Sequence, residues 1–216
     1  MAKVYAEISM SLDGFVAGPN PTLELPLGEG GEQVHEWVFG LAAWRERHGL
    51  EGGEENADSQ MVAEALAETG AYVMGRRMFS GGAGPWEDDP NADGWWGDEP
   101  PFRVPVFVLT HHARETVVKD GGTTFTFVTD GVESAIEQAK SAAAGRGVQI
   151  SGGAMAIQQA LRAGSVDELR VHVAPVLLGS GTALLEGLTE ADVRLGPAEV
   201  TQSSKAVHLR YPIGSG

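Results

Sequence analysis

The 216-residue chain has no cysteine, few basic residues and no long apolar run. The missing cysteines exclude disulfides, thiolate catalysis and cysteine-ligated zinc. A formal net charge of −15 disfavours nucleic acid and anionic membranes as partners. No stretch reaches the roughly 18 apolar residues that a membrane span needs, and no basic, apolar leader opens the sequence. We therefore expect a globular, cytoplasmic protein with a small-molecule substrate, no nucleic-acid partner and no membrane partner.

The pattern of apolar residues predicts an α/β protein with a mostly parallel sheet, because buried strands alternate with helices. Helices are expected over 33–48, from Asp58 or Ser59 to about Thr69, and over 132–145 and 154–164. Strands are expected over 3–11, 71–75, 104–110, 123–129, 147–151 and 167–178. Residues 193–202 and 205–213 have no helix between them and predict a closing antiparallel hairpin. We expect one domain over 1–212 and a flexible tail over 213–216.

Three expected strand ends carry groups that suit a phosphate, namely Gly75–Arg77, Thr110–His111 and Ser151–Ala154. Ligands of open α/β sheets bind at the carboxyl ends of the strands. The glycine pair at 152 and 153 either serves a tight turn or lets an anion approach the amides of the next helix. The arginine pair is either a solvated surface pair or a phosphate clamp. Two separated phosphate sites favour a dinucleotide, although the usual G-x-G-x-x-G fingerprint is absent.

Glu7 lies in the middle of the first expected strand, on the same face as Ser9 and Ser11. A carboxylate inside an α/β sheet is costly unless it is paired or faces a pocket. Either this face lines a ligand cavity, with Glu7 as proton donor or substrate anchor, or the strand lies at an edge. Asp13, in the loop that follows, is the type of residue that stabilises a turn.

Histidines and tryptophans give weaker signals. None of the six histidines pairs at the i, i+4 spacing of a zinc helix, so no metal site is expected. His35, His48, His172 and His208 are interpreted as surface or packing residues. The irregular segment 80–103 holds three tryptophans, which argue that it is ordered. Trp37, Phe39 and Trp86 are candidates for the wall of a substrate site, and core packing is the alternative.

Five stretches, in this order, resemble the dihydrofolate reductase-like superfamily: SMSLDGFVAGPN, AYVMGRRMF, PVFVLTHH, VQISGGA and DELRVHVAPVLLGSGTALLE. They are most similar to the reductase domain of the bifunctional riboflavin-biosynthesis deaminase–reductase. The resemblance implies a three-layer α/β/α fold with a mixed sheet, NADPH as cofactor, and a homodimer. It implies cofactor contacts from Ser9, Asp13, Val16, Ala17, Gly75, Arg76, Arg77, Met78, Thr110, His111, Ser151, Gly152, Gly153, Ala154 and Met155.

These observations together favour an NADPH-dependent reductase that transfers hydride to a small heterocyclic or carbonyl substrate, with Glu7 as the source of the proton. Two alternatives stay open. One is a non-catalytic module that binds NADPH or another nucleotide. The other is a reductase that uses a different reductant, such as a reduced deazaflavin.

Overall fold

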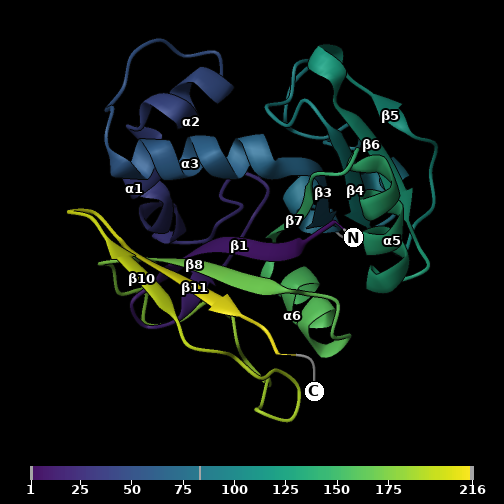
Figure 1. The fold of residues 1–216 in the computed structure, drawn as a ribbon. Coiled ribbons are helices and arrows are strands. Elements are labelled where there is room, and N and C mark those ends of the chain that lie inside the picture. The colour runs from purple at the N-terminus through teal and green to yellow at the C-terminus, as the bar shows by residue number, and fades with distance from the viewer. Residues whose placement is uncertain (1, 83, 215–216) are drawn as a thin grey trace.

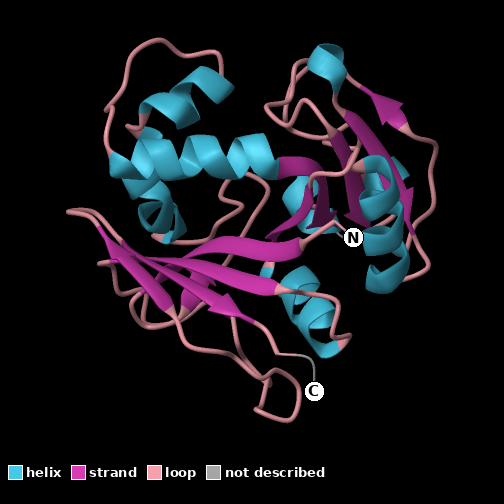
Figure 2. Cartoon of the chain, viewed as in Figure 1, coloured by secondary structure: helices cyan, strands magenta, loops and turns pink. Residues whose placement is uncertain are grey.

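The computed structural model describes residues 2–82 and 84–214. Within them, nine strands form one mixed sheet in the order β10-β11-β8-β1-β7-β3-β4-β6-β5, shown in Figures 1 and 2. The strands are β1 (Val4–Ser11), β3 (Thr69–Gly75), β4 (Pro105–Leu109), β5 (Val117–Val118), β6 (Thr124–Val128), β7 (Gly147–Gly152), β8 (Glu168–Ala174), β10 (Glu199–Gln202) and β11 (Val207–Pro212). A separate antiparallel pair joins β2 (Phe15–Ala17) to β9 (Thr182–Ala183).

The central strands are parallel, as the sequence predicts. β8, β1, β7, β3, β4 and β6 pair in parallel along the sheet, so their carboxyl ends lie at one edge. The predicted closing hairpin is confirmed, since β10 pairs with β11 and β11 pairs antiparallel with β8. The sheet therefore presents one edge where the loops after several strands can meet.

Helices cover both faces of the sheet and make three layers (Figure 1). On one face, α5 (Val132–Ala142) packs against β3, β4 and β7, and α6 (Ala154–Arg162) packs against β3 and β7. Both helices share a buried cluster with Val4 and Ala6 of β1. α5 buries Val132, Ala135, Ile136 and Ala139, which is the spacing of an amphipathic helix. On the other face, α3 (Ala57–Glu68) lies over β1, where the Tyr5 hydroxyl contacts the carbonyl oxygen of Ala65.

The helix expected over 33–48 is wrong as one continuous element. The chain forms a 3-10 turn, η1 (Gly31–His35), then α1 (Glu36–Phe39) and α2 (Ala42–Arg47). Leu41 breaks the helix because its backbone is extended, with φ −77° and ψ 139°, and bridges to Glu54. Its side chain is fully buried in a cluster with Trp37 and Ala206. A tertiary pairing therefore overrides the local helical pattern.

The start of α3 also differs from the expectation. Asn56 is its N-cap and accepts a hydrogen bond from the Ser59 amide at 2.9 Å, whereas Asp58 and Ser59 lie inside the first turn and are buried. At the other end of the chain, Ile213 bridges to Leu195, and Gly214 donates to the Arg194 carbonyl at 3.0 Å. The rest of the expected tail, 215–216, lies outside the described residues.

The irregular segment after α4 (Arg76–Ser80) is packed, as its tryptophans predict. Trp86, in the 3-10 turn η2 (Trp86–Asp88), and Trp96 lie against a buried cluster that includes Phe79, Phe102 and Phe125. The described part of the segment thus packs on the face of β3, β4 and β6 opposite α5.

None of the described helices is both long enough and apolar enough to cross a membrane.

Candidate active site

The strand ends that the sequence singles out come together at the carboxyl edge. Gly75 ends β3, and a Cβ placed on it would lie 3.7 Å from the backbone nitrogen of Gly153. Met78, in α4, packs under the same point, because its sulfur would lie 3.3 Å from a Cβ on Gly152. The Ser151 hydroxyl is 3.8 Å from that sulfur. Gly75, Met78 and Ser151–Gly153 therefore form one surface.

The glycine pair precedes the first turn of α6. Gly152 has φ +130°, a conformation that side chains disfavour, and its peptide bond to Gly153 is cis. Gly153 is exposed, and a Cβ placed on it would meet nothing within 4 Å. The amides of Ala154 and Met155 open the helix and have no intrahelical partner. Met155 is 64% exposed, so this turn is accessible to a ligand. Backbone donors and open space together suit an anion.

The two arginines of α4 have separate roles. Arg76 is buried, pairs with Asp89, and donates to Ser80. Its guanidinium carbon lies 3.5 Å from the centre of the Trp86 ring. Arg77 is exposed, and no hydrogen bond or ion pair of its side chain occurs among the described residues. Arg76 thus anchors the tryptophan-rich segment, and Arg77 is the arginine available to an anion.

Trp86 also contacts the turn after β4, which holds the strand end at Thr110–His111. Its indole nitrogen donates to the carbonyl oxygen of His112 at 2.7 Å, and the ring packs against Phe79 and Phe127. Thr110 is buried, and its hydroxyl oxygen accepts from the His112 amide at 3.1 Å. His111 is exposed at the turn. The ring of Trp86 therefore packs against the protein core, which is the alternative that the sequence left open for this residue.

The loop after β1 is tied to the segment that precedes β9. Asp13 accepts from the amides of Leu178 and Gly179 at 3.1 and 2.7 Å, and from the Ser11 hydroxyl at 2.6 Å. The Ser11 hydrogen bond, with the two amides, keeps the pKa of Asp13 below its ordinary value. Val16 is buried and Ala17 half-buried in β2. Asp13 therefore stabilises the turn, as the sequence indicates.

Glu7 faces a buried polar chain that sequence reasoning missed. Its Oε1 lies 3.1 Å from His172 Nε2, and His172 Nδ1 lies 2.9 Å from His208 Nδ1. His208 Nε2 in turn lies 3.3 Å from Asp58 Oδ1. The interpretation of His172 and His208 as simple packing residues is therefore incomplete. The missed signal is alternation, since Glu168, Arg170 and His172 are polar at every second position of a buried strand.

Arg170 supplies the positive charge of this face. It pairs with Glu68 and Glu168, and its Nη1 lies 3.5 Å from Glu7 Oε2. Burial alone would raise the pKa of Glu7, but the hydrogen bond and charge of His172, and the charge of Arg170, hold it below its ordinary value. Glu7 is therefore a carboxylate at neutral pH.

Trp37 covers the polar chain from α1. Its ring centre lies 4.7 Å from that of His172 and 5.0 Å from that of His208. Its indole nitrogen donates to the Ser9 hydroxyl at 3.0 Å. Phe39, on the same helix, is 40% exposed and packs against Trp44. The structure thus brings Glu7, Ser9 and Trp37 together and places Trp86 in a different cluster.

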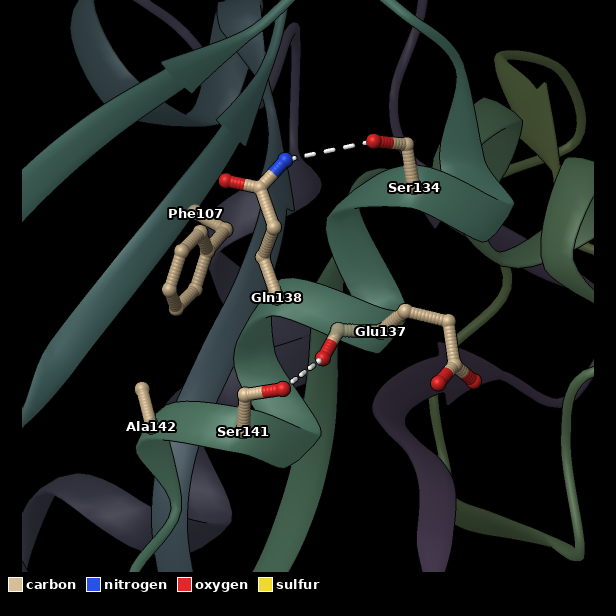
Figure 3. Close-up of a pocket in the computed structure, with 6 residues that line it drawn as sticks. All are labelled: Phe107, Ser134, Glu137, Gln138, Ser141 and Ala142. Carbon is tan, nitrogen blue, oxygen red and sulfur yellow. Dashed lines mark hydrogen bonds between the residues drawn. The ribbon is translucent and has the colours of Figure 1, made fainter.

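An open groove of about 580 Å³ lies along α5, lined by Phe107, Ser134, Glu137, Gln138, Ser141 and Ala142 (Figure 3). Gln138 donates to Ser134 at 3.2 Å, and the Glu137 carboxylate points away from Phe107. The groove therefore holds no cluster of groups that could perform catalysis.

Comparison with solved structures supports the fold. A putative riboflavin biosynthesis protein from Shewanella sp. PV-4 has a TM-score of 0.61 and 22% identity, with 100% of both chains covered. The riboflavin biosynthesis reductase of Saccharomyces cerevisiae has a TM-score of 0.56 and 16% identity, covering 99% of this chain and 90% of the yeast chain. Dihydrofolate reductase from Enterococcus faecalis, complexed with NADP(H), has a TM-score of 0.54 and 13% identity over 99% and 97% of the two chains.

The bifunctional deaminase and 5-amino-6-(5-phosphoribosylamino)uracil reductase of Thermotoga maritima has a TM-score of 0.57 and 12% identity. The alignment covers 99% of this chain but only 57% of the Thermotoga chain. No curated protein matches the sequence. The family of the RibD C-terminal domain, however, matches residues 2–209. On this match and this fold, the chain belongs to the RibD C-terminal domain family of oxidoreductases.

Proposed function

We propose that this chain is an NADPH-dependent reductase that transfers hydride to a small heterocyclic or carbonyl substrate. One observation carries the proposal: the exposed Gly153 and the first turn of α6 lie beside the end of β3, and Arg77 follows that end in α4 with no side-chain partner among the described residues. A phosphorylated dinucleotide requires backbone N–H donors beside open space and a positive charge for its phosphates. The first turn of α6 offers the donors, and Arg77, two residues after Gly75, carries the charge.

The described residues fit this cofactor. Gly153 leaves the space that a Cβ would fill, and Ala154 and Met155 offer free amides for the pyrophosphate. Arg77 would bind the 2′-phosphate, while Thr110 and His111 would lie on the adenosine side. The loop from Ser9 to Ala17 would cover the nicotinamide. When bound, NADPH supplies the hydride.

The residues of the chain would then bind, orient and protonate the substrate. Glu7 and Ser9 lie on one face of β1, and Trp37 of α1 packs over that face. We assign the substrate to this side of the sheet, at its carboxyl edge. Phe39, exposed on α1, would extend this wall. Positioning a substrate within contact of the hydride donor is the main contribution that such a site makes to the rate.

Calorimetric titration with NADPH and NADH, each added separately to the purified protein, tests the cofactor assignment. We expect NADPH to bind in the micromolar range, which corresponds to about −8 kcal/mol, and NADH to bind at least ten-fold more weakly. The absence of binding by either nucleotide would refute the assignment. Binding with equal affinity would refute the role of Arg77.

Loss of nicotinamide absorbance on addition of 5-amino-6-(5-phosphoribosylamino)uracil, the compound named for the Thermotoga neighbour, tests the substrate class first. A set of small heterocyclic and carbonyl compounds follows it. NADPH binding without oxidation by any of them would instead indicate a nucleotide-binding module.

A further inference from the structure

Four titratable side chains form an unbroken line from β1 to α3 beneath Trp37. The line runs from Glu7 through His172 of β8 and His208 of β11 to Asp58 of α3, with successive contacts of 3.1, 2.9 and 3.3 Å. The side chains of His172, His208 and Asp58 are 8%, 2% and 5% exposed, so bulk water does not interrupt the line.

The contacts along this line have room for one proton more than two neutral rings carry. Only one proton fits between the two facing Nδ1 atoms, so one ring donates and the other accepts. A carboxylate oxygen faces each outer Nε2, which favours a proton on both. Two rings that share three protons carry one positive charge, held between two carboxylates. His208 Nε2 makes no aligned hydrogen bond, so its 3.3 Å contact with Asp58 Oδ1 becomes an ion pair only when the pair of rings holds the third proton.

The surroundings permit one imidazolium and disfavour two. Burial lowers the pKa of His208, and the charge of His172 lowers it further, against the pull of Asp58 and Glu7. Burial and the charge of His172 also lower the pKa of His35, in η1, to about 4. Arg170, paired with Glu68 and Glu168, adds a permanent positive charge beside Glu7.

The Glu7 end of the line has an oxygen that makes no hydrogen bond among the described residues. Oε1 contacts His172, whereas Oε2 makes no hydrogen bond within the described residues and lies 3.5 Å from Arg170 Nη1. The Glu7 side chain is 13% exposed, the largest fraction among the four side chains, but its Oε2 atom is buried. Delivery of a proton from Glu7 to a substrate therefore requires that substrate binding uncover Oε2.

We propose that Glu7, His172, His208 and Asp58 are a proton relay that stores one proton between two carboxylates and delivers it through Glu7 to the substrate. This inference rests on the proposed reductase function. It assigns His172, His208 and Asp58 as positioning residues, because they act through Glu7.

The proton transfers balance along the line. Glu7 takes the Nε2 proton of His172, and His172 takes the shared proton from His208, which keeps its Nε2 proton and becomes neutral beside Asp58. The Glu7 carboxylic acid then protonates the substrate atom next to the carbon that receives hydride. NADPH, when bound, would supply the hydride, and the relay supplies the proton. Water reprotonates the relay after the product departs.

Two-bond proton–nitrogen NMR spectra of protein labelled with ¹⁵N-histidine test the relay without cofactor or substrate. His172→Gln and His208→Gln variants assign the signals. Between about pH 5 and about pH 9, we expect the pair to pass from three nitrogen-bound protons to two in a single shared step. Independent titration of the two rings, or two neutral rings throughout this range, would overturn the proposal.

Asp58→Asn and Glu64→Gln form the matched pair of variants, because both remove one negative charge from α3 and Glu64 faces solvent. Asp58→Asn should lower the apparent pKa of the shared step by about one unit, since it removes the opposite charge beside His208, and Glu64→Gln should leave it unchanged. An equal effect of the two variants would contradict the relay. The wild-type spectra decide the question if Asp58→Asn does not fold.

Once a substrate is identified, the rate of NADPH oxidation should fall as the pH rises through the shared step. In Asp58→Asn, this fall should occur at a pH about one unit lower. His172→Gln should restore the thermal stability lost in His172→Ala but not this pH dependence. A failure of NADPH to bind would refute the proposed function and leave the NMR result standing. NADPH binding with an uncharged pair would refute the relay alone.

Discussion

At the scale of single residues, Arg76 and Arg77 show how neighbours in sequence can differ in role. Arg76 turns inward and pairs with Asp89, with side-chain exposures of 7% and 3%. Arg77 stays exposed on the same short helix. The sequence predicts a single role for the pair, either a solvated surface pair or a phosphate clamp, because their spacing does not reveal which side chain the later segment 80–103 contacts.

Arg77→Ala should weaken NADPH binding about ten-fold or more, since a charged hydrogen-bonded contact contributes about 1.5–3 kcal/mol, and should leave NADH binding nearly unchanged. Calorimetry with both nucleotides measures this. Arg103→Ala, which removes another exposed arginine, is the matched control. Equal losses for NADPH and NADH would show that Arg77 does not contact the 2′-phosphate.

Arg76→Met should destabilise the fold by about 3 kcal/mol or more, because it leaves the Asp89 carboxylate buried without its cation. Chemical denaturation gives the free energy of unfolding. The double variant Arg76→Met, Asp89→Leu should recover much of the loss, because it removes both charges. If the double variant is as unstable as the sum of the single variants, the pair does not act as a unit.

At the scale of elements, the start of α3 and the break between α1 and α2 depend on different kinds of information. Asn56 caps α3 through a local hydrogen bond to Ser59. The break at Leu41 depends on its bridge to Glu54 and on burial against Ala206, which lies far away in sequence. The capping hydrogen bond is local, although the sequence predicted Asp58 or Ser59 as the cap instead of Asn56, whereas the pairing of Leu41 with a distant segment leaves no local signal.

Asn56→Ala should lower the free energy of unfolding by about 1 kcal/mol, the usual effect of removing an N-cap. That loss corresponds to a fall in Tm of about 2–4 °C for a protein of this size. Asn56→Ser, which keeps a capping oxygen, should retain most of the stability in the same thermal scan. An equally unstable Ser variant would show that the cap is not the source of the effect.

At the scale of the whole molecule, ion pairs connect neighbouring strands of the sheet. Glu168 in β8 pairs with Lys3 before β1, with Arg170 beside it and with Arg210 of β11. Burial works to raise the pKa of Glu168, but these three cations lower it to about 2. One carboxylate therefore links three neighbouring strands in a protein whose overall charge is strongly negative.

Because its pKa in the folded state is below its ordinary value of 4.5, Glu168 contributes stability above pH 4.5 and loses it as the pH falls towards 2. The full contribution is on the order of 3 kcal/mol. Glu168→Gln should flatten the acid limb of stability against pH, measured by denaturation at each pH. Glu64→Gln serves as the exposed control, and an unchanged acid limb in Glu168→Gln would contradict this assignment.

The sequence by itself determined the α/β class, the parallel strands, the closing hairpin and the glycine-rich strand ends. These depend on hydrophobic periodicity and on backbone conformations that only a few residues adopt. It also indicated that Glu7 is unusual, because a carboxylate inside a buried strand is costly.

Only the tertiary structure decided which polar residues act together. Asp58, His172 and His208 lie more than 30 residues apart from one another. Their alignment with Glu7 requires β1, β8 and β11 to lie side by side in the sheet and α3 to pack over them. The same packing turned Arg76 inward and left Arg77 exposed. Local patterns record which residues a chain can bury, but side-chain partners come from segments that meet only after folding.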